Sequence, residues 1–267
     1  MRVHYRTFGC KTNQYDTERM REALEAQGLA GERVDGPGQA DLCVVNTCTV
    51  TNQADADARR FVRRARRENP AVHIVVAGCS AALHAPVYEA MPGVVAVVEG
   101  HDPAAVADGA RLARAPSAGL SLVQLGTDRS LDRLDWESVG ATVLKRRAGG
   151  TRGWLKVQDG CDRKCAFCAT RLARGPSRSR DPEVVIREAH ALARHHPELV
   201  ITGVHIGHYG RDLDDGLTLA TLVERLITQV PRVRFRLGSI EATEVDEGLL
   251  ELLAGSGGRV APHLHMP

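Results

Sequence analysis

The chain has 267 residues, which is enough for two domains with sizeable hydrophobic cores. Its 43% hydrophobic and 25% charged residues are ordinary for a globular protein, whereas only 4% are aromatic, which argues against extended base-stacking platforms. The formal net charge of +2 supports no nucleic-acid partner by itself, so local basic patches must carry any such argument. Because no apolar run has the length of a membrane span and no signal peptide is recognisable, we expect a cytoplasmic protein without membrane segments.

The first 113 residues alternate short apolar runs with helical patterns. The apolar runs predict strands at residues 3–9, 42–46, 73–77 and 94–98. The helical patterns predict helices at residues 16–27, 54–68, 80–91 and 103–113, the first of them with Asp16 as its N-cap. This alternation with short turns is typical of an α/β domain with a doubly wound parallel sheet.

A linker and a second α/β series follow. Between residues 114 and 150 the periodicity fades and prolines and glycines recur, which predicts a linker with one short strand at 121–125. From residue 151 to 267 we expect strands at 154–158, 199–202, 234–237 and 260–265, separated by helices at 183–195, 219–229 and 245–253. Four such strands are about half of a closed eight-stranded barrel. We therefore expect the first half of a barrel, whose last strand forms an exposed edge.

Cys161, Cys165 and Cys168 follow the first strand of this second series with the spacing C-x3-C-x2-C. A short loop with this spacing can place three thiolates on a 4Fe–4S cluster and leave the fourth iron open. The amino and carboxylate groups of S-adenosylmethionine (SAM) can bind that iron, and an electron passed to the sulfonium would yield a deoxyadenosyl radical. The alternative, a zinc knuckle, lacks a fourth ligand nearby.

Cys10, Cys48 and Cys79 each close a predicted strand of the first domain. Because the carboxyl ends of parallel strands converge on one edge of a sheet, these cysteines could hold a second cluster there. Cys43 differs, since it lies inside its strand, and we interpret it as a buried structural thiol.

Together these residues resemble the methylthiotransferase family of radical SAM enzymes over essentially the whole chain. The similarity lies in GCKTNQYDTE around Cys10, NTCTVT around Cys48, AGC at Cys79 and QDGCDRKCAFC around Cys161, and it continues through RGPSRSR, TGVHIGHYGRDL and SIEATEVD. The resemblance implies two 4Fe–4S clusters. An auxiliary cluster that handles the added sulfur would be ligated by Cys10, Cys48 and Cys79. The cluster that cleaves SAM would be ligated by Cys161, Cys165 and Cys168, with no catalytic residue beyond the cluster ligands.

Two of the motifs indicate a branch of this family. GCKTNQYDTE and TGVHIGHYGRDL look most like the enzymes that insert a methylthio group at carbon 2 of N6-threonylcarbamoyladenosine, next to the tRNA anticodon. The resemblance then implies tRNA as substrate, a flavodoxin- or ferredoxin-like electron donor and a monomer. Two alternatives stay open: methylthiolation of a ribosomal-protein aspartate, and a non-catalytic iron–sulfur or RNA-binding fragment.

The chain departs from the family pattern in two respects. Arg171 stands where the family commonly has proline after the third cysteine, which changes loop stiffness but removes no ligand. The sequence reaches Pro267 where the family continues with further barrel strands and a small C-terminal RNA-binding (TRAM) domain. We therefore expect an incomplete radical SAM domain and no TRAM domain.

Further candidates are binding residues. The resemblance places SAM contacts at the ends of barrel strands and beside the triplet, at Phe167, Thr202, Gly203, His205, Ser239 and Glu241. Each could instead be an ordinary core or loop residue. On the helix expected at 54–68, arginines could meet tRNA phosphates or could form a solvated face: Arg59, Arg60, Arg63, Arg64 and Arg67. His263 and His265 alternate along the last expected strand, so we expect both to line the barrel.

Overall fold

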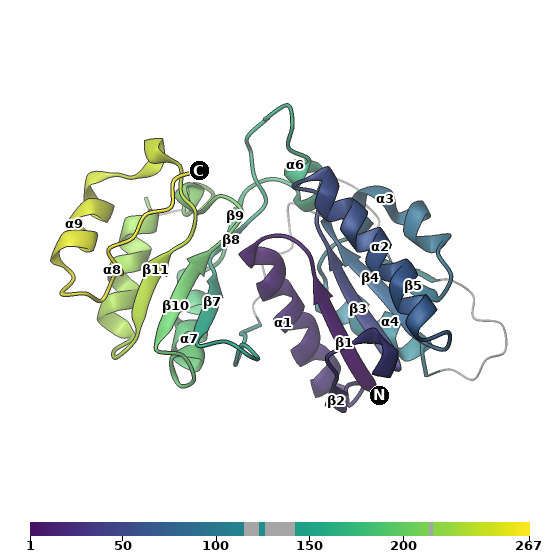
Figure 1. The fold of residues 1–267 in the computed structure, drawn as a ribbon. Coiled ribbons are helices and arrows are strands. Elements are labelled where there is room, and N and C mark those ends of the chain that lie inside the picture. Colours follow the sequence, from purple (N-terminus) through teal and green to yellow (C-terminus); the bar gives the residue numbers. More distant parts are fainter. Residues whose placement is uncertain (115–122, 126–141, 214–215) are drawn as a thin grey trace. The chain divides into compact units, whose positions relative to one another are not determined.

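The computed structural model describes residues 1–114, 123–125, 142–213 and 216–267 (Figure 1). These residues form two compact units. Unit 1 comprises Met1–Leu131 together with Lys164–Arg174, and unit 2 comprises Asp132–Arg163 together with Gly175–Pro267. The triplet segment that follows Arg163 therefore belongs with the N-terminal unit. Among the described helices, none combines the length and apolar character needed to cross a membrane.

Unit 1 is built on a parallel sheet. Its strand order is β2-β1-β3-β4-β5-β6, and every neighbouring pair runs parallel. The strands are β1 (Arg2–Thr7), β2 (Glu32–Arg33), β3 (Leu42–Thr47), β4 (His73–Gly78), β5 (Val94–Val98) and β6 (Val123–Leu125). All side chains of β3 and β5 are buried, as expected for strands covered on both faces. The predicted doubly wound sheet is confirmed, with the two-residue β2 added at one edge.

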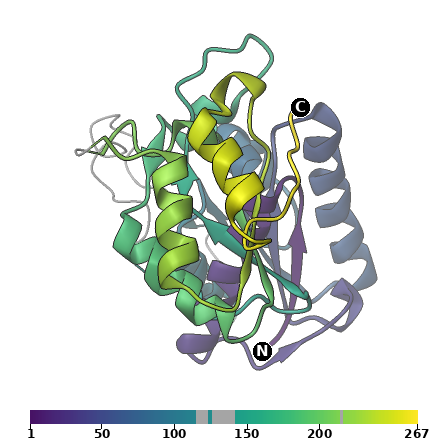
Figure 2. The same ribbon diagram turned by 90° about the vertical axis from the view of Figure 1, so that its left-hand side faces the viewer.

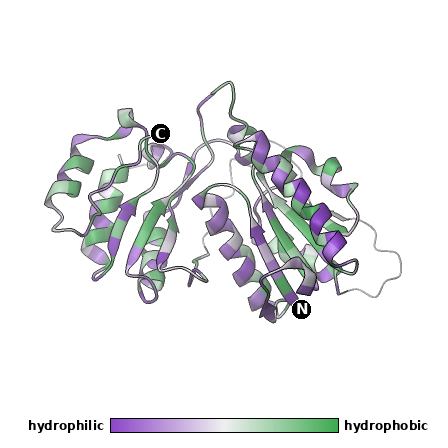
Figure 3. Cartoon of the chain, in the orientation of Figure 1, coloured by the Kyte–Doolittle hydropathy of each residue, from purple (hydrophilic) through white to green (hydrophobic). Residues whose placement is uncertain are grey.

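Helices cover both faces of this sheet. They are α1 (Lys11–Ala26), α2 (Asn52–Glu68), α3 (Cys79–Glu89) and α4 (Pro103–Leu112), with a 3-10 turn η1 (Pro37–Gln39). Apolar side chains of α1 and α4 pack on one face of the sheet, and those of α2 and α3 pack on the other. Figure 3 shows the central strands coloured mostly hydrophobic and α2 mostly hydrophilic. That contrast fits an amphipathic helix with one buried stripe.

The predicted N-cap of the first helix is wrong. α1 begins at Lys11 with Cys10 as its N-cap, so it starts directly at the end of the turn after β1. Asp16 lies inside the helix and is 4% exposed. Its carboxylate is held by an ion pair with Arg174, a long-range partner that the local pattern does not reveal. Asp at an internal position is unfavourable for a helix by itself, and the tertiary contact overrides that preference.

Unit 2 contains a parallel sheet of order β11-β10-β7, with β7 (Arg152–Lys156), β10 (Glu198–Thr202) and β11 (Arg234–Leu237). A short antiparallel pair, β8 (Gln158–Asp159) and β9 (Arg178–Ser179), follows the end of β7. The helices are α7 (Pro182–Ala193), α8 (Leu219–Gln229) and α9 (Glu247–Gly255), with 3-10 turns η2 (Ile206–His208) and η3 (Ala242–Glu244). α7 packs on β7 and β10, and α8 packs on β11. α8 in green and α9 in yellow lie side by side (Figure 2).

The last predicted strand is wrong as a continuous element. Only two isolated parallel bridges occur in residues 260–265, Phe235 with Val260 and Ser239 with His265. Pro262 lies between them and has no N–H to donate to a ladder. The backbone N–H of His263 instead donates to the Ala261 carbonyl at 2.7 Å, which makes a tight turn. The chain therefore follows β11 as a fourth barrel strand would, but the proline interrupts the pairing.

Candidate active site

Three cysteines gather at the carboxyl edge of the sheet in unit 1. Cys10 follows β1, Cys48 directly follows β3, and Cys79 directly follows β4 and begins α3. Gly9 adopts φ +100°, and a Cβ built on it would lie 2.5 Å from the Cys48 Sγ. Only glycine allows the end of β1 to pass so close to the thiol of the neighbouring strand. The turn that carries Cys10 therefore lies in close contact with Cys48, as the parallel topology inferred from the sequence requires.

These thiols influence one another electrostatically. Burial raises the pKa of the Cys48 thiol, and a thiolate at Cys10 would raise it further. Burial also raises the pKa of Cys79 to about 11, with smaller increases from Cys48 and Cys10. The Cys48 and Cys79 thiols are therefore protonated at neutral pH and must lose their protons when they bind a metal. A nearby cation would ease that loss, because it stabilises thiolates.

Arg174 supplies this cation from α6 (Thr170–Arg174), a short helix that belongs to unit 1. Its side chain is 2% exposed, and its Nη2 lies 2.7 Å from a carboxylate oxygen of Asp16. The same Nη2 donates to Asn13 Oδ1 at 2.8 Å and lies 2.9 Å from His101 Nε2. His101 Nε2 is in turn 3.6 Å from the Cys79 Sγ. Against the effect of burial, Arg174 lowers the pKa of Cys79.

This environment fits an iron–sulfur cluster on its three cysteines. A cluster bound by three thiolates carries net negative charge, and a buried guanidinium beside the thiols offsets it. The sequence predicted the cysteines as ligands but no role in this site for Asn13, Asp16, His101 and Arg174. Three of these four stand in motifs that carried the resemblance, Asn13 and Asp16 in GCKTNQYDTE and Arg174 in RGPSRSR. These motifs therefore contained the residues, but no pattern of neighbouring residues connects Arg174 with Asp16, 158 positions away.

Cys43 lies elsewhere. It sits within β3 and is fully buried in the apolar core beneath α2 and α3. Burial raises its pKa to about 12, which makes it a poor metal ligand. The predicted burial is confirmed.

The second cysteine set lies within residues 161–168. Cys161 lies in unit 2, where its backbone N–H donates to the Gly175 carbonyl at 3.1 Å. Cys165 and Cys168 lie in the segment of unit 1 and are exposed, and the Cys168 N–H donates to the Cys165 carbonyl at 3.1 Å. Phe167, between them, is 89% exposed and is not a core residue. Exposed thiols on a short loop are available to a metal, so the donor set suits a cluster.

A histidine pair and a buried carboxylate adjoin Cys161 in unit 2. His205 Nδ1 lies 3.6 Å from the Cys161 Sγ, and its Nε2 lies 2.8 Å from the Glu244 carboxylate. His208 Nε2 lies 3.1 Å from the same carboxylate, and the two imidazole rings stack with centroids 3.8 Å apart. Burial, and to a lesser extent His205, lowers the pKa of His208. Arg163 Nη2 adds a cation 3.3 Å from Glu244.

The other predicted SAM contacts also lie at strand ends in unit 2. Thr202 is the buried last residue of β10, and a Cβ on the next residue, Gly203, would lie 2.9 Å from the Gln158 carbonyl oxygen. Ser239 Oγ is 2.8 Å from His265 Nδ1. Glu241 is half exposed and 3.0 Å from Arg163.

The buried carboxylate of this edge is Glu244, whose side chain is 4% exposed. The sequence instead led us to expect a SAM contact at Glu241, three residues earlier in the same motif. The 3-10 turn η3 carries Glu244 back toward the histidines, and no periodicity in the sequence predicts that turn.

A basic groove of about 690 Å³ runs along α2 in unit 1. It is lined by Arg6, Phe8, Asp57, Arg60, Phe61, Arg63, Arg64 and Arg67. The Arg6 guanidinium lies 5.1 Å from the Phe8 ring centroid, and that of Arg64 lies 5.3 Å from the Phe61 ring centroid. Of the five arginines predicted from sequence, Arg59 is the exception: it does not line the groove and pairs with Asp55 at 2.7 Å.

Comparison with known proteins adds two family matches. Residues 2–100 match the uncharacterized protein family UPF0004, and residues 155–267 match the Radical SAM superfamily. The chain is 39% identical over 270 residues to a threonylcarbamoyladenosine tRNA methylthiotransferase of Bacillus subtilis, covering 99% of this chain and 57% of that protein. It is 34% identical over 271 residues to the protein of that name from Thermotoga maritima, covering 99% of this chain and 57% of the relative.

A relative with another substrate in its name is also similar. The chain is 32% identical over 284 residues to a ribosomal protein uS12 methylthiotransferase of Roseiflexus, covering 100% of this chain and 59% of that protein. The chain thus spans somewhat more than half the length of the curated relatives that it matches.

Proposed function

Because the chain belongs to the radical SAM methylthiotransferase family, we propose that it takes part in inserting a methylthio group at carbon 2 of N6-threonylcarbamoyladenosine in tRNA. The observation that carries the proposal is the edge where Cys10, Cys48 and Cys79 meet beside the buried cation Arg174. An enzyme that only cleaves SAM would not need these N-terminal cysteines, because Cys161, Cys165 and Cys168 already provide three ligands for one cluster. The second set is what sulfur insertion requires beyond SAM cleavage.

The chain's own residues have separable tasks in this proposal. Family membership implies SAM and a 4Fe–4S cluster, which when bound supply radical chemistry and a methyl group. Cys161, Cys165 and Cys168 hold that cluster, and Cys10, Cys48 and Cys79 hold the auxiliary one. Arg174 balances the charge of the auxiliary site. By the resemblance, the residues that would contact SAM are Phe167, Thr202, Gly203, His205, Ser239 and Glu241.

Selective removal of each cysteine set tests this division. After anaerobic reconstitution we expect about eight irons in the wild type, and about four each in the Cys161/Cys165/Cys168→Ala and Cys10/Cys48/Cys79→Ala variants. Cys43→Ala is the matched control, because Cys43 is buried in the core and should leave the iron content unchanged. If the N-terminal triple variant kept all of its iron, the auxiliary site would be disproved.

The reaction is tested by identifying its products. We expect methylthiolated N6-threonylcarbamoyladenosine by mass spectrometry of tRNA nucleosides when a strain lacking this activity is complemented with the protein, and none with Cys10→Ala. The uS12 relative makes a ribosomal-protein aspartate the specific alternative. Methylthiolation of that protein without any change in tRNA would decide for the alternative.

The α2 groove supports the choice of RNA. Arg63 and Arg67 are exposed and, within the described residues, form no ion pair, so both guanidiniums are available to phosphates. Replacing both by alanine should weaken binding of an anticodon stem–loop RNA and flatten the logarithmic salt dependence by about 0.9 for each lost phosphate contact. Arg59→Ala, on the same helix but paired with Asp55, should leave the slope unchanged. If the salt dependence of the Arg63/Arg67 variant had the same slope as that of the wild type, RNA would not bind in this groove.

The electron donor, the oligomeric state and the cellular compartment are further parts of the proposal. A flavodoxin- or ferredoxin-like donor would supply the electron, the protein would act as a monomer, and it would work in the cytoplasm with tRNA. All three rest on the resemblance to tRNA-modifying relatives.

A further inference from the structure

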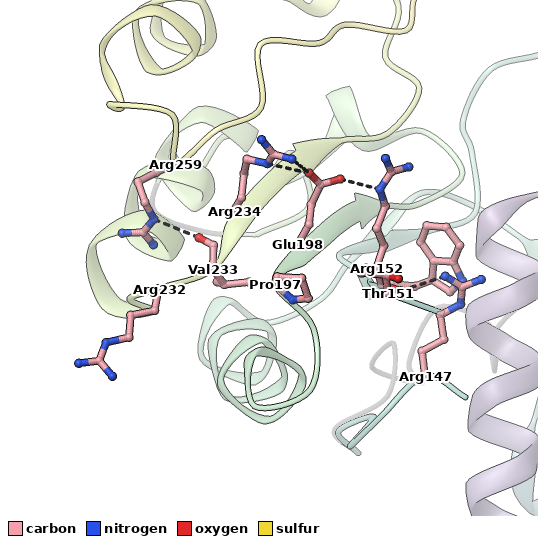
Figure 4. A pocket seen from close by; sticks show the side chains of 10 residues that line it. Arg147, Thr151, Arg152, Pro197, Glu198, Arg232, Val233, Arg234 and Arg259 are labelled. Carbon is pink, nitrogen blue, oxygen red and sulfur yellow. Dashed lines mark hydrogen bonds and ion pairs between the residues drawn. The ribbon is translucent and has the colours of Figure 1, made fainter. Parts of the chain in front are cut away.

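A cavity of about 910 Å³ opens at the amino-terminal ends of β7, β10 and β11 in unit 2 (Figure 4). Cys161 follows the opposite, carboxyl-terminal ends of these strands, so the cavity is separate from the candidate SAM site. Besides Thr151, Trp154, Pro197 and Val233, its lining consists of one acid, Glu198, and five arginines: Arg147, Arg152, Arg232, Arg234 and Arg259.

The single carboxylate of the cavity is already fully neutralised. Glu198 accepts from Arg152 at 2.8 Å, from Arg234 at 2.6 Å and from Arg236 at 2.8 Å, and its side chain is 6% exposed. Although burial acts to raise it, hydrogen bonds from Arg236 and Arg234 hold the pKa of Glu198 below its usual range. The carboxylate therefore stays ionised and positions these arginines, and the cavity keeps a large excess of positive charge.

Two side chains that line the cavity have a donor without an acceptor among the described residues, although the Trp154 Nε1–H itself has no exposed surface. Trp154 is 7% exposed, yet within the described residues its indole Nε1–H donates to no acceptor. A buried unpaired donor costs free energy, so such groups are normally satisfied. Arg147 covers the Trp154 ring, with its guanidinium carbon 4.1 Å from the ring centroid, and fixes the indole in place. Arg232 is exposed and, among the described residues, makes no hydrogen bond or ion pair through its side chain.

The backbone at Arg232 is also unusual. Its φ of 66° is the only positive φ of a non-glycine residue in the described chain. A bulky side chain in the left-handed region is strained, and such strain is often found where a side chain has a function. Here the turn between α8 and β11 places Arg232 in the lining of the cavity, and its exposed side chain extends outward from the rim (Figure 4).

We propose that this cavity binds a phosphate group. Most of the charged lining side chains are guanidiniums, whose planar fork matches the oxygens of phosphate and carboxylate groups, and a phosphate carries more charge to balance five arginines. The volume is that of a small-molecule site and exceeds a single ion, so the phosphate belongs to a larger ligand. That ligand is either a free phosphate ester, such as a nucleotide, or a phosphodiester of RNA. This site is independent of the proposed function.

Inorganic pyrophosphate is a suitable first probe. The chain has two tryptophans, so Trp136→Phe leaves Trp154 as the only indole reporter. We expect pyrophosphate to change the Trp154 fluorescence saturably and to bind in calorimetry. Arg232→Gly removes a cation while relieving the positive φ, so it should not destabilise the fold but should weaken binding about tenfold. Trp154→Phe, measured by calorimetry, keeps a ring beneath Arg147 and loses only a buried N–H, so it should bind pyrophosphate as the wild type does.

Arg187→Ala removes an exposed arginine from α7, away from the cavity, and should bind pyrophosphate as the wild type does. If an RNA oligonucleotide competes with pyrophosphate for the Arg232-dependent site, the natural ligand is a phosphodiester; if it does not, the ligand is a free phosphate ester. No binding at millimolar pyrophosphate, or equal affinity in the wild type and Arg232→Gly, would overturn the proposal.

Discussion

Replacing Arg174 with methionine should unfold unit 1 more easily and empty its cysteine edge of iron. The guanidinium is the buried partner of Asp16, and losing one member of such a pair typically costs about 3 to 5 kcal/mol of unfolding free energy. The same change removes the cation that lowers the pKa of Cys48 and Cys79, so these two thiols hold their protons more tightly. In a Cys161/Cys165/Cys168→Ala background, where only the auxiliary site can bind iron, we expect the iron content to fall from about four per chain toward zero.

Three further variants distinguish the cation's electrostatic role from general destabilisation. Arg171→Met removes an exposed arginine from the same short helix and should change neither stability nor iron content. Arg174→Lys keeps the charge and should retain part of the iron. Arg174→Met combined with Asp16→Asn removes the unpaired carboxylate and should recover much of the unfolding free energy, measured by denaturant titration, but not the iron. Full iron in Arg174→Met would show that the cluster site does not need the cation.

The parallel sheet was predictable because its strands are nearly continuous apolar runs. β3 and β5 are buried on both faces, and this leaves a compositional trace that hardly depends on the rest of the chain. Cys10, Cys48 and Cys79 could be grouped from sequence for a related reason. Each stands at a strand end, and parallel topology alone brings strand ends to one edge.

The partners of those cysteines could not be predicted in the same way. Arg174 reaches Asp16 across 158 positions of the chain, and Glu244 reaches His205 across 39. Neither sequence separation follows from a helix or strand period, because the contacts depend on how a short helix and a 3-10 turn fold back. Pro262 could have been interpreted correctly from the sequence, because a proline has no N–H to donate to a strand pair. The strand was predicted nevertheless, because apolar residues and histidines alternate around it.

Arg180 should be as important to unit 2 as Arg174 is to unit 1. Its guanidinium makes two parallel contacts with Glu188, at 3.0 and 3.1 Å, and the two side chains are 1% and 0% exposed. The same group donates to the Lys156 carbonyl at 2.6 Å, and Glu188 accepts the Leu144 N–H at 2.9 Å. The pair thus joins β7, α7 and the segment that precedes β7. Arg180→Met leaves a buried unpaired carboxylate, so we expect a loss of about 3 to 5 kcal/mol in the unfolding free energy of unit 2.

The double variant Arg180→Met/Glu188→Leu is the sharper experiment. Replacing a whole buried ion pair by apolar side chains is often neutral, so most of the loss should be recovered. Recovery should stay incomplete by about 1 to 3 kcal/mol, because the Leu144 N–H then has no acceptor. Arg187→Met, exposed on the same helix as Glu188, is the control and should melt like the wild type. A double variant as unstable as Arg180→Met alone would show that apolar packing cannot replace the pair, and that its charges specify how the segment before β7 is held.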